Sequence, residues 1–189
     1  MTPRFTKALI LAAHAHEGQC RKGGPIPYIT HPVAVACLVA QFRGDEDQQI
    51  AALLHDVLED GGPHYAAEIK WKFGSRVLAI VQGCTDGVPD ETGQKPPWAE
   101  RKQAYIAHLA NAGADVLLVS GCDKLSNARA VLDDLVAIGP AVFERFKAKK
   151  EGTLWYYTEV SRVFTAAQTP MAKQLAQTVA EIRELAEKA

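Results

Sequence analysis

The chain has 189 residues, and its 21 basic and 22 acidic residues give a formal net charge of -1. This length suits one domain with a substantial core, and the balanced charge lacks the basic excess that nucleic-acid binding usually needs. The longest apolar segments are shorter than the roughly 20 residues that span a bilayer, and the N-terminus lacks a signal-peptide pattern. We therefore expect one cytoplasmic domain over residues 1–189 that binds neither nucleic acid nor membrane.

Apolar residues recur at helical spacing along nearly the whole chain, and no stretch has a convincing strand pattern. The third predicted helix begins at Asp45, which can cap it together with Gln48, and Gly61 and Gly62 end it. The other helices are predicted around 5–13, 33–39, 63–73, 75–84, 98–111, 115–135, 140–164 and 170–188. The sequence therefore predicts an all-α fold, a single compact helical bundle.

Two further segments bear on the surroundings of a site. Residues 87–97 form the longest predicted loop, which is a candidate for the mobile edge of a site. The segment 170–188 carries an apolar stripe that packs either on its own domain or on a second copy, so that a homodimer stays open. The stripe consists of Leu175, Val179, Ile182 and Leu185.

The most informative segment is 51–60, where an apolar helical run ends in His55, Asp56, Glu59 and Asp60. The C-terminus of a helix carries partial negative charge, so each carboxylate there costs roughly 0.3–1 kcal/mol unless a cation compensates. Glu59 follows His55 by four residues and Asp60 follows Asp56 by four, so each pair is expected along one helix face. The segment predicts a cation site with acid/base groups beside it.

Two more polar residues stand in apolar surroundings. His31 lies at the entrance of a helix, directly before Pro32. Asp123 follows the apolar segment 116–122, where a lone buried carboxylate is unfavourable without a partner. Together with His55 and Asp56 they form a mixed nitrogen and oxygen set that suits manganese, iron or zinc and leaves positions for water and substrate.

Basic residues predict an anion-binding surface beside this metal site. Arg21 and Lys22 precede two glycines, which let a backbone approach phosphate closely. Lys124, Asn127 and Arg129 add donors after Asp123, and an arginine can hold a phosphate through two hydrogen bonds. These groups together would hold a highly anionic small molecule against the metal.

Five motifs carry a resemblance to a known family. They are HEGQCRK at 16–22, PYITHP at 27–32, HDVLED at 55–60, GCTD at 83–86 and DKLSNAR at 123–129. In order and spacing they resemble the hydrolase domain of the Rel/SpoT alarmone enzymes, which is an HD-superfamily domain. The resemblance covers about residues 5–164 and is closest to the small hydrolase-only members.

The resemblance implies a function and a role for each matching residue. Family members remove the 3′-pyrophosphate from ppGpp or pppGpp and release GDP or GTP. By this resemblance His31, His55, Asp56 and Asp123 match the metal ligands, usually of Mn²⁺ although another divalent metal is possible. Glu59 and Asp60 match the catalytic pair. The expected contacts with the nucleotide substrate are Arg21, Lys22, Tyr28, Lys124, Asn127, Arg129 and Tyr156.

The chain departs from the family pattern at two places, and two alternative functions stay open. The segment 23–26 is one residue longer than the commonest pattern, and Ser126 stands where a histidine or tyrosine is often found.

One alternative is an HD phosphohydrolase for another phosphorylated nucleotide, such as pppApp or the 2′-phosphate of NADPH. The other is a non-catalytic alarmone-binding domain, which would require the loss of a metal ligand or of Glu59 or Asp60.

Overall fold

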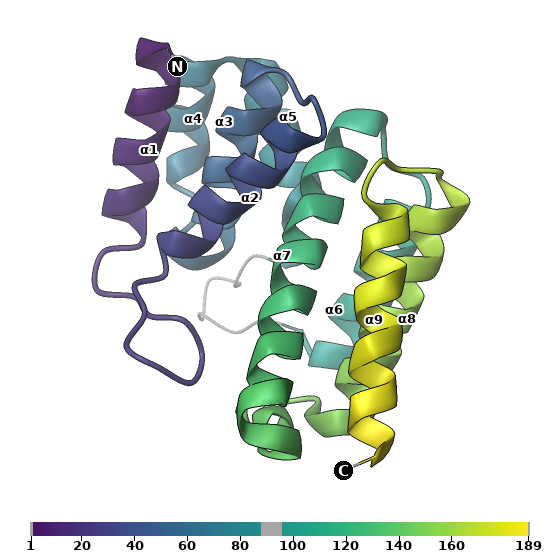
Figure 1. Ribbon diagram of the computed structural model, residues 1–189. Helices are drawn as coiled ribbons and strands as arrows, with labels where there is room; N and C mark the ends of the chain where they lie inside the picture. The colour runs from purple at the N-terminus through teal and green to yellow at the C-terminus, as the bar shows by residue number, and fades with distance from the viewer. Residues whose placement is uncertain (1, 88–95, 189) are drawn as a thin grey trace.

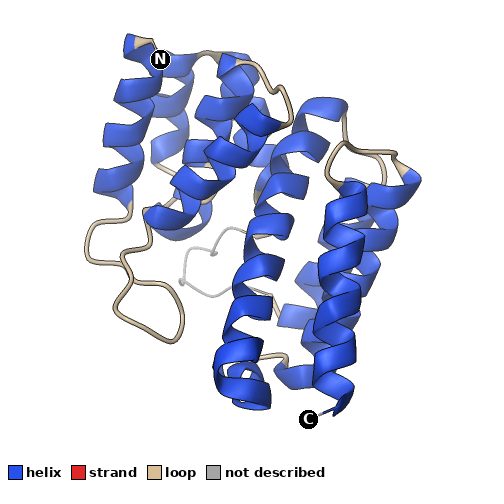
Figure 2. Cartoon of the chain, viewed as in Figure 1, coloured by secondary structure: helices blue, strands red, loops and turns tan. Residues whose placement is uncertain are grey.

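The computed structural model describes residues 2–87 and 96–188, and over these ranges the chain consists of helices and the loops between them (Figure 2). The all-α prediction is therefore confirmed. The elements are α1 (Pro3–Ala15), α2 (Thr30–Gln41), α3 (Glu46–Leu54), the π-helical turn η1 (Val57–Gly61), α4 (Tyr65–Phe73), α5 (Ser75–Cys84), α6 (Trp98–Leu109), α7 (Ala114–Ile138), the 3-10 helix η2 (Gly139–Arg145), α8 (Lys149–Ala166) and α9 (Ala172–Lys188).

The helices form two groups that share α7 (Figure 1). In the N-terminal group α3 packs against α1, α2 and α5, and its side chains Ile50, Leu53 and Leu54 are fully buried. In the C-terminal group α7, α8 and α9 pack on one another, and α6 packs on α8. Because α7 is 25 residues long, it contacts α2, α3 and α5 as well as α8 and α9. Polar residues near the middle of α7 therefore face the junction of the two groups.

The capping box predicted for the third helix is confirmed. The side chain of Asp45 accepts a hydrogen bond from the backbone N–H of Gln48 at 3.0 Å, and the Gln48 side chain accepts one from the Asp45 N–H at 2.8 Å. The prediction that this helix continues to Gly61 is wrong. It ends at Leu54, and after His55 and Asp56 the chain widens into the π turn η1, in which the N–H of Gly62 donates to the carbonyl of Val57 at 3.1 Å.

The predicted single helix over 140–164 is also wrong, because the chain changes direction within it. Gly139 has a φ of 65° and begins the short helix η2, which buries Val142 and Phe143. Phe146 is extended, and α8 begins only at Lys149. The break lets both the η2 side chains and the inner face of α8 reach the core, which one straight helix could not do.

The C-terminal helix packs on its own chain. α9 lies against α7 and α8, and Leu175, Val179 and Ile182 of its apolar stripe are buried there (Figure 1). Most of the loop predicted over 87–97 falls on residues 88–95, which lie outside the described residues. Among the helices that the structure describes, none combines the length and apolar character needed to cross a membrane.

Candidate metal centre

The four predicted metal ligands come together from three helices at the junction of the two groups. His31 is the second residue of α2, His55 and Asp56 follow α3, and Asp123 lies in the middle of α7. Nε2 of His31 is 3.1 Å from Oδ1 of Asp123, and Nε2 of His55 is 3.0 Å from Oδ2 of Asp56. The two remaining histidine–aspartate distances are both 3.6 Å. One ligand atom each from His31, His55 and Asp123 lies within 4.8 Å of the other two.

The hydrogen bonding of the two imidazoles suits a cation. Nδ1 of His55 is 2.8 Å from the carbonyl oxygen of Ala52, and because a carbonyl only accepts, Nδ1 carries the proton. In the neutral ring Nε2 then presents its lone pair to the centre. Nε2 of His31 and of His55 are both buried and have no hydrogen-bond partner of suitable geometry among the described residues. Buried groups without partners are unfavourable, and a divalent ion would satisfy both nitrogens.

The electrostatics of the centre also attract positive charge. Burial lowers the pKa of His31, whereas at His55 the opposing effects of Asp56 and Asp123 outweigh burial and raise the pKa well above its ordinary value. The carboxyls of Asp56 and Asp123 both have lowered pKa values, because the neighbouring cationic groups outweigh the effect of burial. The two carboxylates therefore stay ionised and draw a cation to the point that the histidines face.

Several residues predicted to bind substrate contact the candidate metal ligands. The hydroxyl of Tyr28 donates to Oδ2 of Asp56 at 2.6 Å. On α7, the side chain of Asn127 donates to Oδ1 of Asp123 at 2.6 Å, and Lys124 forms an ion pair with Oδ2 of the same carboxylate. Such contacts fix the orientation of ligating side chains, and their loss typically weakens metal binding. Ser126 also touches this shell, since its Oγ is 3.4 Å from Nδ1 of His31.

The basic segment at 21–24 forms a tight loop next to the centre. The N–H of Arg21 donates to the carbonyl of Ile26 at 2.8 Å, and a side-chain nitrogen of Arg21 donates to Oδ1 of Asn127 at 3.0 Å. Gly23 has a φ of 91°, and a Cβ there would come within 2.4 Å of the guanidinium carbon of Arg145. The loop is therefore seated against η2 and α7 and presents its cations to the junction.

Glu59 and Asp60 lie on η1, three and four residues after Asp56. Burial and the charge of Lys102 lower the pKa of Lys22, and the charges of Asp60 and Glu59 oppose this shift. Lys22 of the basic loop, Lys102 of α6 and the two acids are thus within electrostatic reach of one another. The predicted phosphate-binding lysine therefore lies near the predicted acid pair.

Two of the residues predicted to contact the substrate interact with α9 and with Lys102. Arg129 donates to Oε1 of Gln174 on α9 at 2.7 Å, so its guanidinium is engaged in the packing of the last helix. Tyr156 is 7% exposed, and its hydroxyl has no hydrogen-bond partner within the described ranges. Nζ of Lys102 lies 4.8 Å from the centre of the Tyr156 ring.

Sequence reasoning missed three charged residues beside the acid pair. Asp86 follows α5 with only 4% of its side chain exposed, and it forms ion pairs with both Arg101 and Lys102 of α6. Nη1 of Arg101 is also 4.0 Å from Oε1 of Glu59. Asp86 belongs to the GCTD motif, which matched the family but did not indicate what Asp86 does. Arg101 and Lys102 lie near the start of α6, where a pair of charged residues is typical of a solvent-exposed helix face.

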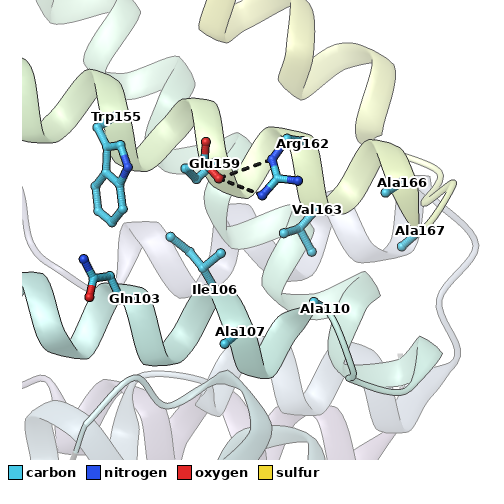
Figure 3. A pocket seen from close by; sticks show the side chains of 10 residues that line it. All are labelled: Gln103, Ile106, Ala107, Ala110, Trp155, Glu159, Arg162, Val163, Ala166 and Ala167. Atoms are coloured by element: carbon cyan, nitrogen blue, oxygen red, sulfur yellow. Dashed lines mark hydrogen bonds and ion pairs between the residues drawn. The ribbon is translucent and has the colours of Figure 1, made fainter.

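The groove between α6 and α8 is separate from this chemistry (Figure 3). It has a volume of about 530 Å³, and Trp155 of α8 and Ile106 of α6 extend into it from opposite sides. Its polar wall contains the ion pair between Glu159 and Arg162, with a distance of 2.9 Å. None of the candidate metal or acid residues lines the groove.

Comparison with known proteins decides the family. A model of the HD domain family matches residues 8–154. The chain belongs to the HD domain family. The resemblance predicted from the five motifs is confirmed by curated relatives of this HD domain. The guanosine-3′,5′-bis(diphosphate) 3′-pyrophosphohydrolase of Haemophilus influenzae is 38% identical over 122 residues, which are 64% of this chain and 17% of that protein.

Two further relatives differ in how much of their length the HD domain covers. The bifunctional (p)ppGpp synthase/hydrolase SpoT of Escherichia coli K12 is 48% identical over 80 residues, or 42% of this chain and 11% of that protein. MESH1 of Danio rerio, also named a guanosine-3′,5′-bis(diphosphate) 3′-pyrophosphohydrolase, is 36% identical over 121 residues. That match covers 62% of this chain and 63% of MESH1. The chain therefore spans a small part of the two bacterial relatives and most of MESH1.

Solved structures share the fold of this HD domain. The protein lmo0812 of Listeria monocytogenes superposes with a TM-score of 0.69 at 26% identity, covering 79% of this chain and 96% of that one. A metazoan orthologue of SpoT, whose description states that it hydrolyses ppGpp, superposes with a TM-score of 0.61 at 23% identity. That match covers 88% of this chain and 97% of the orthologue.

Proposed function

We propose that this HD domain is a divalent-metal-dependent hydrolase that removes the 3′-pyrophosphate from ppGpp and pppGpp, with Mn²⁺ as its metal. The observation that carries the proposal is the pair of buried imidazole nitrogens facing two carboxylates, with the acids Glu59 and Asp60 beside them on η1. The names of the relatives from Haemophilus influenzae and Danio rerio support the choice of substrate.

In this proposal His31, His55, Asp56 and Asp123 hold the metal. The ion, when bound, supplies Lewis acidity, which acidifies water and polarises a phosphoryl oxygen. Tyr28 and Asn127 orient the carboxylates of Asp56 and Asp123 through their hydrogen bonds. Lys124 forms an ion pair with the other carboxylate oxygen of Asp123 and so balances the charge of this ligand. Its main role is therefore at the metal site, and any contact with substrate is secondary.

In this proposal the acid pair transfers protons and the basic loop binds the phosphates. Glu59 and Asp60 orient the attacking water and accept its proton, and one of them returns a proton to the departing ribose 3′-oxygen. Lys22 lies within electrostatic reach of both acids, so a phosphate held by Lys22 is placed beside them. Arg21, fixed by its hydrogen bond to Asn127, adds a second cation for the phosphates.

The test measures pyrophosphate release from ppGpp by the purified protein with Mn²⁺ and with EDTA as a control. Pyrophosphate release from pppApp and orthophosphate release from NADPH are measured in parallel. Fast metal-dependent release from ppGpp is expected. Release from NADPH or pppApp alone would assign a different phosphorylated nucleotide. Bound metal without release from any of the three would contradict a hydrolase and favour a binding role.

Amide variants of the acid pair separate chemistry from metal binding. In E59Q and D60N the metal ligands remain, so we expect unchanged Mn²⁺ content and a loss of turnover of about 100- to 10,000-fold, the range typical of a general acid or base. D123N serves as the contrasting variant and should lose metal and turnover together. Unchanged turnover in both E59Q and D60N would overturn the mechanism.

A further inference from the structure

Arg101 of α6 joins two carboxylates that come from different elements. Its Nη1 forms an ion pair with Oδ1 of Asp86, which follows α5, and lies 4.0 Å from Oε1 of Glu59 on η1. Its Nε donates to the carbonyl of Pro96 at 3.3 Å, so the guanidinium is also fixed by the backbone that precedes its own helix. Only 14% of the Arg101 side chain is exposed. These contacts hold the guanidinium in one place beside the acid pair.

Asp86 is the anchor of this arrangement. Its side chain is 4% exposed, and it forms ion pairs with both Arg101 and Lys102. Burial alone would raise its pKa, but Lys102, Lys124 and Arg101 outweigh this effect and lower it, so the carboxyl is ionised. Gly87 adds room for the arginine, since a Cβ there would come within 2.9 Å of Cδ of Arg101.

The stability of α6 itself does not explain why Arg101 and Lys102 lie near its N-terminus. Arg101 and Lys102 are the fourth and fifth residues of α6, near the helix end whose partial positive charge disfavours basic side chains. Their placement is compensated by Asp86, which belongs to the other helix group. The pairs therefore dock the start of α6 onto the segment that follows α5.

From these contacts we propose that Arg101 is a positioning residue for Glu59 and that Asp86 holds Arg101 in place. The inference rests on the proposed hydrolase function, in which Glu59 handles a proton. At 4.0 Å the guanidinium orients the Glu59 carboxylate by charge without a direct hydrogen bond between these two atoms. Arg101 thus aims the carboxylate without taking the reacting proton.

The experiment measures kcat and KM for ppGpp with Mn²⁺ in the full chain and in R101Q, R101K and D86N. A positioning role predicts that kcat falls by about 10- to 100-fold in R101Q while KM changes little, the range seen when a residue supporting a site is lost. R101K keeps the charge and should retain more activity than R101Q. A rise in KM with unchanged kcat would instead make Arg101 a phosphate ligand and overturn the proposal.

A double variant and a rescue experiment exclude a merely structural effect. Because Asp86 acts through Arg101, R101Q/D86N should be no slower than R101Q alone. Millimolar guanidinium should restore part of the kcat of R101A and leave R101A/E59Q inactive. Additive losses in the double variant, or no rescue in an R101A protein whose thermal unfolding matches the parent, would contradict the proposal.

A matched control comes from a second arginine that bridges carboxylates. Arg76 on α5 pairs with Asp45 and Asp115 at 2.7 and 2.9 Å on an exposed part of the surface. R76Q should leave kcat and KM unchanged. If the parent protein releases no pyrophosphate from ppGpp, the proposed function fails; if the parent is active and R101Q matches it, only the positioning role fails.

Discussion

The hydroxyl of Tyr28 donates a 2.6 Å hydrogen bond to Oδ2 of Asp56, the oxygen that also faces Nε2 of His55 at 3.0 Å. The Asp56 carboxyl has a lowered pKa and the phenol a raised one, so the proton stays on Tyr28 and the carboxylate stays an acceptor. Tyr28 also packs its ring against His16 and His31. A residue that follows the basic loop thus fixes a candidate metal ligand that follows α3.

Tyr28→Phe tests this relationship, because it keeps the ring contacts and removes the hydrogen bond. We expect Mn²⁺ affinity to fall by about 10-fold, at the lower end of the range for supporting residues of metal sites. Calorimetric titration of Mn²⁺ measures the effect, with Tyr65→Phe on α4 as the control. Equal affinities of Y28F and the parent would show that the hydrogen bond does not orient Asp56.

Gly23→Ala tests whether the basic loop must approach Arg145 closely. The substitution strains a residue with a φ of 91° and places Cβ within 2.4 Å of the Arg145 guanidinium. A left-handed conformation costs a non-glycine residue roughly 1–2 kcal/mol, so displacement of the loop should raise the KM for ppGpp by about tenfold.

Gly24→Ala is the matched control for that substitution. A Cβ at Gly24 meets no heavy atom within 4 Å, and Gly24 is not among the residues with positive φ. We expect its KM to equal that of the parent. If G23A and G24A raised the KM equally, the effect would come from loop entropy and not from the contact with Arg145.

Asp86→Asn should make stability less dependent on pH. The folded-state pKa of Asp86 is lowered, so its stabilising effect is present above the ordinary carboxyl pKa of about 3.9 and is lost as the pH falls through the folded value. At pH 7 we expect D86N to be less stable by about 2–3 kcal/mol, because Arg101 and Lys102 lose their buried partner.

Urea unfolding of both proteins from pH 7 to pH 2.5 checks this expectation. The difference in unfolding free energy between the parent and D86N should shrink as the pH falls below about 4, because Asp86 of the unfolded parent takes up a proton at a higher pH than Asp86 of the folded parent. A difference that stays constant over this range would show that the ion pairs of Asp86 add no stability.

Asp45→Ala should affect the fold and leave the chemistry intact. It removes the capping box of α3, and loss of such a cap costs about 0.5–2 kcal/mol. Thermal unfolding should reveal the loss, while kcat for ppGpp should equal that of the parent. A large fall in kcat with unchanged stability would connect the start of α3 to the centre that follows its end, which the structure does not suggest.

The sequence predicted the parts of this protein that depend on local patterns. The capping box at Asp45, the helix Ser75–Cys84 and the buried position of Asp123 all follow from residue type and spacing. His31 and His55 were paired with Asp56 and Asp123 from chemistry and family resemblance, and the structure brings all four together.

The rest depends on tertiary contacts that spacing does not encode. The residue types of the π turn η1 do not distinguish it from the end of an α-helix, and the break between η2 and α8 follows from the burial of Val142 and Phe143. Asp86 and Arg101 are 15 residues apart, and only the packing of α6 against the end of α5 pairs them. Lys124 was predicted to bind substrate, and the ion pair of its ammonium with Asp123 is a further contact that the sequence did not reveal.

The π turn at Val57–Gly61 also affects how the chain tolerates changes in length. A π turn holds one residue more than an α turn, and each residue of an α-helix rotates the chain by about 100°. Deleting Leu58 would shorten this turn to the length of an ordinary α turn and would change the direction in which Glu59 and Asp60 extend relative to His55 and Asp56. In this short stretch we therefore expect single-residue deletions to do more harm to activity than most side-chain substitutions, while the helices on either side stay folded.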